Sequence, residues 1–353
     1  MVAPRIRWRT ARLAPRRREA GAQRVTRENA RVRHFRSVVR HAKLRRMIAA
    51  VTGANGFIGR HVCERFAADG WIVRPIVRRD IEQGRLDELI EGSDVVVHVA
   101  GATRAPSRVM LHESNVELTR RVVQAATAAR VRRLVFISSQ AAAGPASSSD
   151  AAVTEDAPPQ PIEAYGRSKL GAELAVRDAA PDLEHVIVRP ASVYGPGDRD
   201  FLAMFRLARH GLALHAGNRR QLISIVHVRD VIDAIVLAAT TGPANRTFFV
   251  ANDEPVTWSN LFKMAAECAG RTIVAEVNLP RPLVAAGAAV GDVVATLRRR
   301  AGLLTSEKAA LAKPPYWICS NARAKQELGF SSRIGLEAGL RETYEWYVSN
   351  GWL

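Results

Sequence analysis

The chain has 353 residues, of which 47% are apolar and 24% charged, a composition that excludes a disordered, collagen-like or disulfide-stapled protein. Its formal net charge of +18 is concentrated at the start, because residues 1–46 hold 16 Lys and Arg against 2 Glu, which leaves 36 against 32 for the rest. The basic character therefore belongs to a tail, and no nucleic-acid partner is expected for residues 47–353.

The tail lacks the apolar run of a secretory signal peptide, and we expect it to be disordered. Three interpretations stay open: a polybasic arm for nucleic acid or anionic lipid, an organelle transit segment, or translation from a start placed too early. The third is favoured because "MIAAVTGANGFIG" begins at Met47, where the first strand of a dinucleotide fold is expected.

The cysteines and the hydropathy of the chain indicate the cellular compartment of the protein. The three cysteines form no CxxC pair and have no histidine at metal-ligand spacing, which predicts a reduced cytoplasm and no metal site. The longest apolar stretch outside the sheet starts at Leu283, is interrupted by Asp292 and is too short to span a bilayer. We expect no transmembrane segment, although a membrane-surface contact at this stretch stays open.

The first predicted elements after Met47 are a strand, a glycine-rich turn and a helix, in "MIAAV", "TGANGFIG" and "RHVCERFAADG". Glycines at 53, 56 and 59 allow a sharp turn, a close approach to a pyrophosphate and tight packing of the helix. The unpaired N–H groups at the helix start then face the phosphates. This order predicts a dinucleotide site, for which three glycines alone would be weak evidence.

The second predicted strand, "WIVRPIV", ends beside the position of the adenosine ribose, where a site selective for NAD commonly carries an acidic side chain. Here the strand is followed by Arg78 and Arg79. A guanidinium favours the 2′-phosphate of NADP, so NADP is the preferred cofactor and NAD the alternative. Arg78 as an ordinary surface arginine stays open.

Further buried strands are predicted at 94–101, 133–139 and 185–193, separated by helical stretches. Ligands of such parallel sheets bind beyond the carboxyl ends of the strands. The residues that matter should therefore follow each strand, namely residues 100–103, Ser138 and Ser139, and residues 190–194. The overall expectation is an α/β fold, a doubly wound parallel Rossmann sheet.

A tyrosine and a lysine four positions apart, Tyr165 and Lys169, follow in a chain with only six lysines. This spacing puts both side chains on one face of a helix. A nearby ammonium and a nicotinamide cation are expected to lower the pKa of the phenol by about three units toward neutrality. Ser139 would then hold the substrate oxygen. Packing of Tyr165, surface exposure of Lys169 and capping by Ser139 are the structural alternatives.

These motifs together resemble the extended short-chain dehydrogenases/reductases, also called the NAD-dependent epimerase/dehydratase family. The resemblance rests on "TGANGFIG" at 52, "DVVVHVAG" at 94, "NVELTRRVV" at 115, "FISSQAAAG" at 136, "YGRSK" at 165 and "RPASVYGPGD" at 189, and it covers nearly all of residues 47–353. It implies a catalytic set of Ser139, Tyr165 and Lys169. It also implies that Asn115 supports the cofactor and the geometry of the site, and that the protein forms a homodimer.

The resemblance divides the chain after the tail into a Rossmann domain at 47–195 and a smaller, mostly helical substrate lobe at 196–353, interleaved with the last sheet strands. The expected cofactor-binding residues are Gly53, Asn55, Gly56, Phe57, Ile58, Gly59, Arg78, Ala100, Gly101, Ala102, Asn115, Tyr165, Lys169, Pro190 and Val193. The expected substrate-binding residues are Thr103, Gln140, Ser192, Tyr194 and Phe201. For Phe201, Met204 and Phe205, a place in the core is the alternative to a pocket.

The predicted function is an NAD(P)-dependent oxidoreductase that reduces a ketone or oxidises a secondary alcohol. The strand ending "VRPIVRRD" resembles the dihydroflavonol reductase and 3β-hydroxysteroid dehydrogenase branches. A nucleotide-sugar epimerase or dehydratase with retained NAD is the first alternative, weakened because Ser192 stands where many such epimerases carry an asparagine. A non-catalytic cofactor-binding scaffold is the second. The catalytic set alone does not decide between reductase and epimerase.

Overall fold

The computed structural model describes residues 46–179, 183–215, 217–298 and 306–353, without the side chains of Arg281, Val290 and residues 292–298 and 306–308. The basic tail was expected to be disordered, and all of its residues except Arg46 lie outside the described residues. Residues 47–353 form one compact unit.

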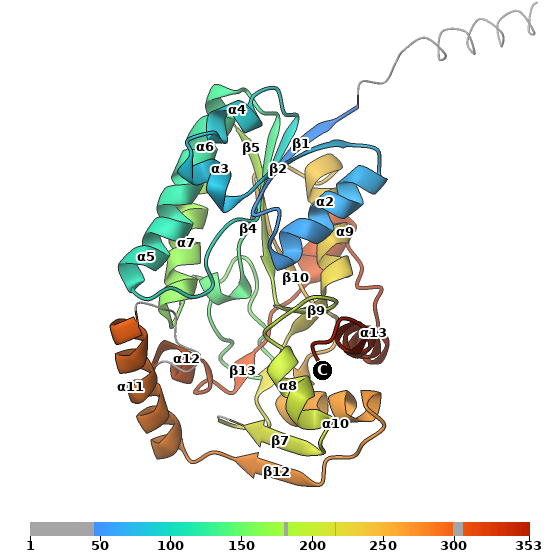
Figure 1. The fold of residues 1–353 in the computed structure, drawn as a ribbon. Coiled ribbons are helices and arrows are strands. Elements are labelled where there is room, and N and C mark those ends of the chain that lie inside the picture. The colour runs from blue at the N-terminus through green and yellow to red at the C-terminus, as the bar shows by residue number, and fades with distance from the viewer. Residues whose placement is uncertain (1–45, 180–182, 216, 299–305) are drawn as a thin grey trace, which may run out of the picture. The chain divides into compact units, whose positions relative to one another are not determined.

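A six-stranded sheet forms the centre of this unit, and all of its neighbouring strands are parallel (Figure 1). The strand order is β2-β1-β3-β4-β5-β10, so the chain leaves β1 toward one edge and then returns to the other side. The sheet is therefore doubly wound, as predicted. The strands are β1 (Ile48–Thr52), β2 (Ile72–Ile76), β3 (Val95–His98), β4 (Arg133–Ile137), β5 (Glu184–Pro190) and β10 (Arg246–Val250).

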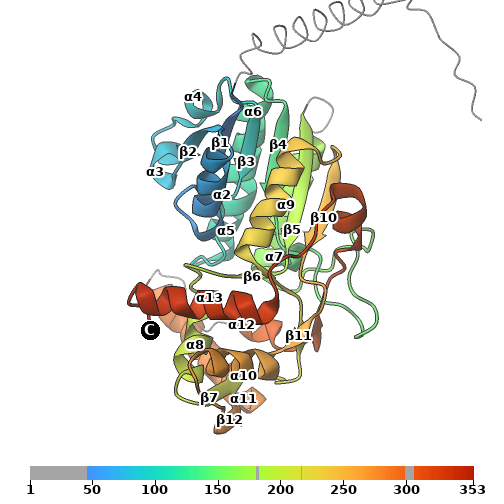
Figure 2. The same cartoon turned by 90° about the vertical axis from the view of Figure 1, so that its right-hand side faces the viewer.

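Helices cover both faces of the sheet, which explains why its central strands read as continuous apolar runs. One face carries α2 (Phe57–Ala68) and α9 (Val228–Thr240), and the other carries α6 (Leu118–Ala128) and α7 (Ala164–Asp178) (Figure 2). The shorter helices α3 (Arg78–Glu82), α4 (Leu86–Ile90), α5 (Arg108–His112) and η1 (Glu113–Glu117) connect these elements.

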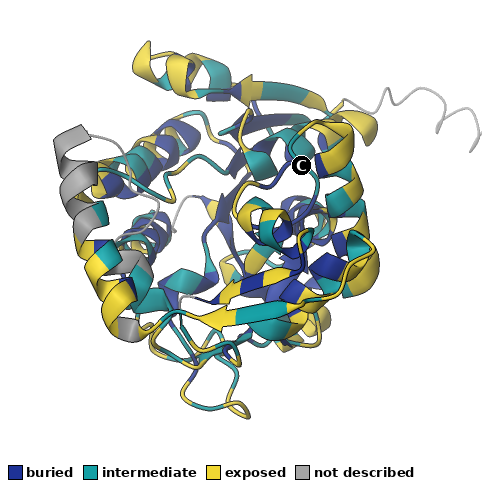
Figure 3. Cartoon of the chain, turned by 60° about the horizontal axis from the view of Figure 1, so that its bottom comes forward, coloured by how far each residue is buried: buried dark blue, intermediate teal, exposed yellow. Residues whose placement is uncertain are grey.

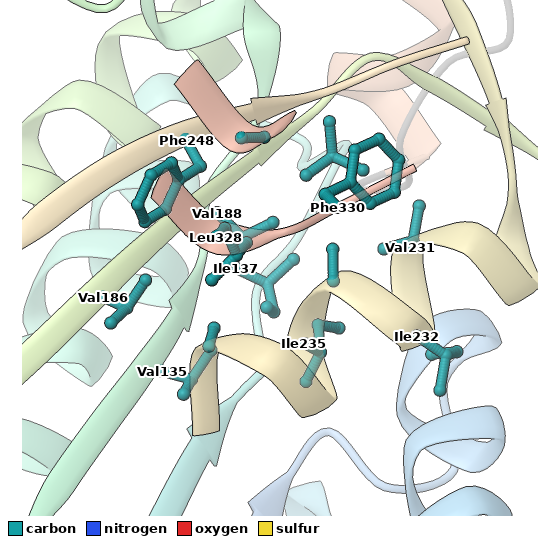
Figure 4. Packing of buried hydrophobic residues seen from close by; sticks show 14 of the residues in the cluster. Val135, Ile137, Val186, Val188, Val231, Ile232, Ile235, Phe248, Leu328 and Phe330 are labelled. Atoms are coloured by element: carbon teal, nitrogen blue, oxygen red, sulfur yellow. The ribbon is translucent and has the colours of Figure 1, made fainter. Parts of the chain in front are cut away.

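Two apolar cores lie on the two faces of the sheet because side chains alternate along each strand. In β4, Val135 and Ile137 belong to the core under α9, whereas Leu134 and Phe136 belong to the core under α6 and α7. Figure 4 shows the first core, where valines of β4 and β5 meet Ile235 of α9.

The remaining elements form a smaller lobe below the carboxyl ends of the strands (Figure 1). Its core contains Phe205, Leu261 and Tyr347, all fully buried. The elements of the lobe are β6 (Ser192–Tyr194), α8 (Leu202–Ala208), β7 (Leu212–His215), β8 (Leu222–Ile223), β9 (Ile225–His227), β11 (Val256–Thr257), α10 (Trp258–Cys268), β12 (Ala275–Asn278), α11 (Arg281–Arg298), α12 (Ser306–Leu311), β13 (Tyr316–Trp317), η3 (Ala324–Leu328) and α13 (Leu336–Ser349). Between β9 and β11 the chain returns to the large sheet as α9 and β10.

Two features are absent from the described residues. Among them, no helix has the length and apolar character needed to cross a membrane. No group of three or more His, Cys, Asp or Glu side chains suited to a metal ion was found in the same residues.

Candidate active site

The turn between β1 and α2 is built for close approach of a ligand to the backbone. Gly53 has a φ of +69°, and a Cβ at this position would lie 2.8 Å from the backbone nitrogen of Ala100. A Cβ on Gly59 would lie 2.0 Å from the carbonyl oxygen of Gly53. Helix α2 begins at Phe57 without a capping side chain or an acidic residue in its first turn. Its first N–H groups therefore remain available to phosphate oxygens, and the pyrophosphate of NAD(P) fits this turn.

The segment after β3 connects this turn to the catalytic residues. A Cβ on Gly101 would lie 2.8 Å from Oδ1 of Asn115 and 3.9 Å from Nζ of Lys169. Asn115 is buried in the π-helical turn η1, and its side chain accepts a hydrogen bond from the Ala102 N–H at 2.7 Å and donates to Ser168 Oγ at 2.7 Å. Asn115 thus fixes residues 100–102 against α7.

A buried chain of hydrogen bonds supports Asn115 from behind. Thr119 Oγ1 donates to the Asn115 carbonyl at 2.6 Å, so its oxygen accepts the hydrogen of His98 Nε2 at 2.9 Å. Nδ1 of His98 then accepts from Thr52 Oγ1 at 2.7 Å. Burial, aided by the charge of Lys169, lowers the pKa of His98 to about 3, so the ring is neutral. These hydrogen bonds connect Thr52, at the end of β1, to the residues around Asn115.

Close packing of α7 against the segment after β4 brings Ser139 and Tyr165 together. A Cβ on Gly166 would lie 2.3 Å from the Ala141 carbonyl oxygen, so only glycine allows this approach. Glu163 caps α7 and accepts the N–H groups of Tyr165 at 2.6 Å and Gly166 at 2.5 Å. The half-buried Tyr165 side chain is hydrogen-bonded to Ser139.

The two serines at the end of β4 have different surroundings. Ser138 is buried and donates to Oε1 of Glu173 at 2.5 Å. Glu173 is fully buried and also accepts from Arg189 Nη2 at 2.6 Å. Ser138 is therefore part of a structural ion-pair network, whereas Ser139 is the serine beside Tyr165.

Lys169 is 4% exposed and lies on the buried face of α7. Its Nζ donates to the Ile137 carbonyl at 2.6 Å and lies 4.3 Å from the centre of the Phe136 ring. Burial lowers the pKa of Lys169 to about 7, an effect that the Glu173 carboxylate opposes. The end of β4 thus holds the ammonium beneath Gly101.

Lys169 does not make the phenol of Tyr165 acidic in the protein alone, and the expected lowering of this pKa beside a bound nicotinamide stays a prediction. Burial raises the pKa of Tyr165 to about 12, the hydrogen bond with Ser139 opposes the rise, and the carboxylates of Glu163 and Asp200 add to it. The reason is geometric, because the Lys169 ammonium donates to a backbone carbonyl. In addition, the pKa of Lys169 is itself lowered to about 7, which reduces its positive charge at neutral pH. The phenol therefore keeps its proton at neutral pH.

Arg78 is the first residue of α3 and is exposed. Within the described part of the chain, its side chain has no hydrogen bond or ion pair. The nearest carboxylate in the sequence, Asp80, accepts from the Val77 N–H at 2.8 Å and pairs with Arg85. No acidic side chain that follows β2 directly is thus free to bind a ribose hydroxyl.

The other expected site residues differ in how far they are buried. Asn55, Gly56 and Ile58 lie in the glycine turn and the start of α2, Pro190 ends β5, and Val193 lies in β6. Thr103 is exposed in the segment that follows β3, and Ser192 is exposed at the start of β6. Gln140 is 5% exposed, and its Nε2 has no hydrogen-bond partner. Tyr194 and Phe201, by contrast, lie in the core of the lobe with 0% and 6% exposure. That placement gives them a packing role, and their contact with substrate stays a prediction.

Sequence reasoning missed His98, Thr119, Glu163 and Gly166. A signal existed for His98, since a histidine inside the apolar run "DVVVHVAG" must find buried partners. No comparable signal marked Gly166, because its close approach to Ala141 comes from packing between separate elements.

The fold and this site together define an NAD(P)-dependent oxidoreductase with a Rossmann sheet. Comparison with known proteins makes the family specific. Residues 49–251 match the NAD dependent epimerase/dehydratase family, and the chain belongs to that family. The predicted fold and class of enzyme are thereby confirmed.

Individual relatives differ in reaction and substrate. Ceramide reductase of Caulobacter vibrioides is 30% identical over 327 residues, which cover 87% of this chain and 96% of that protein. A decarboxylating sterol-4-alpha-carboxylate 3-dehydrogenase of Saccharomyces cerevisiae is 28% identical over 268 residues, 72% of this chain and 76% of that protein. The structure of MoeE5 in complex with UDP-glucuronic acid and NAD has a TM-score of 0.70 at 25% identity and covers 86% of this chain and 99% of that one.

Proposed function

We propose that this enzyme reduces the ketone of a long-chain, lipid-like substrate with NADPH. The proposal is supported by the placement of Tyr165, which is hydrogen-bonded to Ser139 at the start of α7; burial raises its pKa to about 12, so the phenol is protonated at neutral pH and able to donate a proton. Ser139 and Tyr165 would bind the ketone oxygen together, and Tyr165 would give that oxygen its proton. When bound, the reduced nicotinamide supplies the hydride that the carbonyl carbon receives.

Lys169 and Asn115 have supporting roles in this proposal. Lys169 lies on the same helix as Tyr165, so its ammonium, when protonated, would stabilise the phenolate left after proton transfer. Asn115 and the hydrogen-bond chain through His98 would hold residues 100–102 and α7 at a fixed separation. Ser139 would donate to the developing alkoxide, so the protein stabilises charge at the oxygen from two sides.

Two lines of reasoning support a lipid-like substrate. As their names state, the two relatives described above act on a ceramide and on a sterol carboxylate, and both molecules are largely apolar. Ser192 stands where many nucleotide-sugar epimerases carry an asparagine for the diphosphate, which disfavours a UDP-sugar. The unpaired Nε2 of Gln140, next to Ser139, is a donor that a polar group beside the ketone would satisfy.

An assay of NADPH oxidation with a long-chain β-keto amide and its short-chain analogue tests the proposal. We expect one alcohol formed per NADPH consumed, and a kcat/KM at least about tenfold higher for the long chain, because each buried methylene contributes about 0.8 kcal/mol. Cofactor that stays bound during purification, together with epimerisation of a UDP-sugar without net NADPH consumption, would instead establish the epimerase alternative.

The preference for NADPH rests on Arg78, and its replacement is a direct test. We expect Arg78→Gln to weaken NADPH binding by about 10- to 100-fold, because a charge-assisted hydrogen bond contributes about 1.5–3 kcal/mol, and to leave NADH binding unchanged. Titration calorimetry measures both affinities. Arg79→Gln, at the exposed neighbouring position, is the matched control. Equal losses for both cofactors would show that Arg78 does not recognise the 2′-phosphate.

Two properties of the whole protein stay predictions. The described cysteines are all free, which supports a reducing compartment such as the cytoplasm. A homodimer is supported only by the resemblance to the family.

A further inference from the structure

The strands β7 and β12 form a two-stranded parallel ribbon at the end of the lobe, far from the large sheet in Figure 1. In their register Leu212 pairs with Ala275 and Leu214 with Val277, so these four side chains share one face. Leu212, Leu214 and Val277 are 41%, 42% and 50% exposed. The ribbon therefore presents its apolar face to solvent.

The opposite face of the ribbon already supplies its contacts with the fold. Ala213 and His215 are buried there, and the His215 ring packs against Phe262 of α10 at 5.1 Å between centroids. Glu276, the partner of Ala213 in the register, accepts from Ser259 Oγ at 2.7 Å and pairs with His215 at 3.0 Å. The outward apolar side chains are thus not needed to attach the ribbon.

Exposed apolar side chains also flank β12 in the sequence. Val274 precedes the strand and is 78% exposed, and Leu283, in the first turn of α11, is 63% exposed. Figure 3 turns this end of the molecule toward the viewer. Ten large apolar residues are exposed in the described part of the chain. Five of them are Val274, Leu283 and the three ribbon residues Leu212, Leu214 and Val277. Such clustering marks an interaction surface.

The charges of the surrounding segments indicate what this surface meets. Residues 209–215 and 271–280 contain two arginines, Arg209 and Arg271, and a single carboxylate, Glu276. Glu276 lies on the opposite face of the ribbon, where it contacts His215, Ser259 and Arg219. A second copy of this surface would bring no carboxylate to these arginines, whereas the phosphate groups of lipids would pair with them.

We infer that this surface, the outward face of the β7–β12 ribbon with Val274 and the start of α11, lies on an anionic lipid bilayer without crossing it. Leucine and valine side chains would enter the region between headgroups and acyl chains, and the arginines would contact phosphates. The inference goes beyond the proposed reaction. A lipid-like substrate would be drawn from the same bilayer, but the binding does not depend on catalysis.

Vesicle co-sedimentation of the full chain tests the inference with two double variants. Leu214→Ser with Val277→Ser removes two apolar side chains of the ribbon. Leu174→Ser with Val348→Ser removes the same residue types at 51% and 48% exposure, on α7 and α13. On phosphatidylcholine vesicles with and without phosphatidylglycerol, we expect the ribbon variant to lower the partition coefficient at least about tenfold, and the control to leave it unchanged.

The design separates this surface from other sources of binding. Both variants keep the basic residues 1–46, so attraction of that segment to anionic lipid contributes equally, and the neutral vesicles suppress it. Unchanged melting temperature and NADPH affinity exclude misfolding. Equal vesicle binding by both variants would overturn the inference. So would self-association in sedimentation velocity that the ribbon variant alone loses, since a second copy would then be the partner.

Discussion

Replacing Tyr165 by phenylalanine should lower kcat for ketone reduction by about 10³-fold, within the range of about 10² to 10⁴ for general acid catalysis. The variant keeps the ring on α7 and removes only the hydroxyl that is hydrogen-bonded to Ser139. We therefore expect KM, NADPH affinity and melting temperature to change little. Single-turnover kinetics with pre-bound NADPH measure the effect on the chemical step.

A second readout distinguishes proton donation from packing. Because the pKa of Tyr165 is raised to about 12, its proton is present throughout pH 6–10, and this group should add no slope to the reductive rate there. In the reverse direction the phenolate is required, so the oxidative rate should rise with pH over the same range. Tyr344→Phe, on α13, is the control for the same chemical change outside the site. A Tyr165→Phe enzyme with near-normal kcat would remove Tyr165 from the mechanism.

Local patterns carry enough information to predict the sheet and the order of its ligand-binding loops. The run at β3 is buried on both faces, which is typical of a parallel sheet covered by helices on both sides. The glycine turn was predictable because the strand before it and the helix after it restrict what three glycines can do. The rule for carboxyl ends of strands singled out Ser139, whereas its grouping with Tyr165 was implied by the resemblance to the family.

The orientation and protonation of side chains could not be predicted in the same way. The spacing of Tyr165 and Lys169 places them on one face of α7, but the Ile137 carbonyl and the Phe136 ring decide where the ammonium points. These partners come from β4, about 30 residues earlier in the chain. The sign of the pKa shift at Tyr165 depends on burial, which a sequence pattern does not report. The apolar outward face of β7 was missed for the same reason.

Replacing Lys169 by methionine should stabilise the folded protein at pH 6 while it impairs catalysis. Burial lowers the pKa of Lys169 from 10.5 to about 7. Below about pH 7 the folded protein must hold the charged form of this side chain, and this lowers the free energy of unfolding. Methionine fills similar space without charge but leaves the Ile137 carbonyl without its donor. We expect a net gain on the order of 2 kcal/mol at pH 6 and a loss in kcat of about 10²-fold.

The pH dependence gives this prediction its sign. The unfolded chain binds a proton at Lys169 up to about pH 10.5 and the folded protein only up to about pH 7, so this residue makes stability rise with pH between these values. The advantage of Lys169→Met should therefore shrink from pH 6 to pH 10, as urea unfolding at several pH values measures. Lys263→Met, at an exposed position of α10, should change stability little at either pH. A Lys169→Met protein less stable than its parent at pH 6 would mean that the ammonium, held by the Ile137 carbonyl and the Phe136 ring, stabilises the fold rather than straining it.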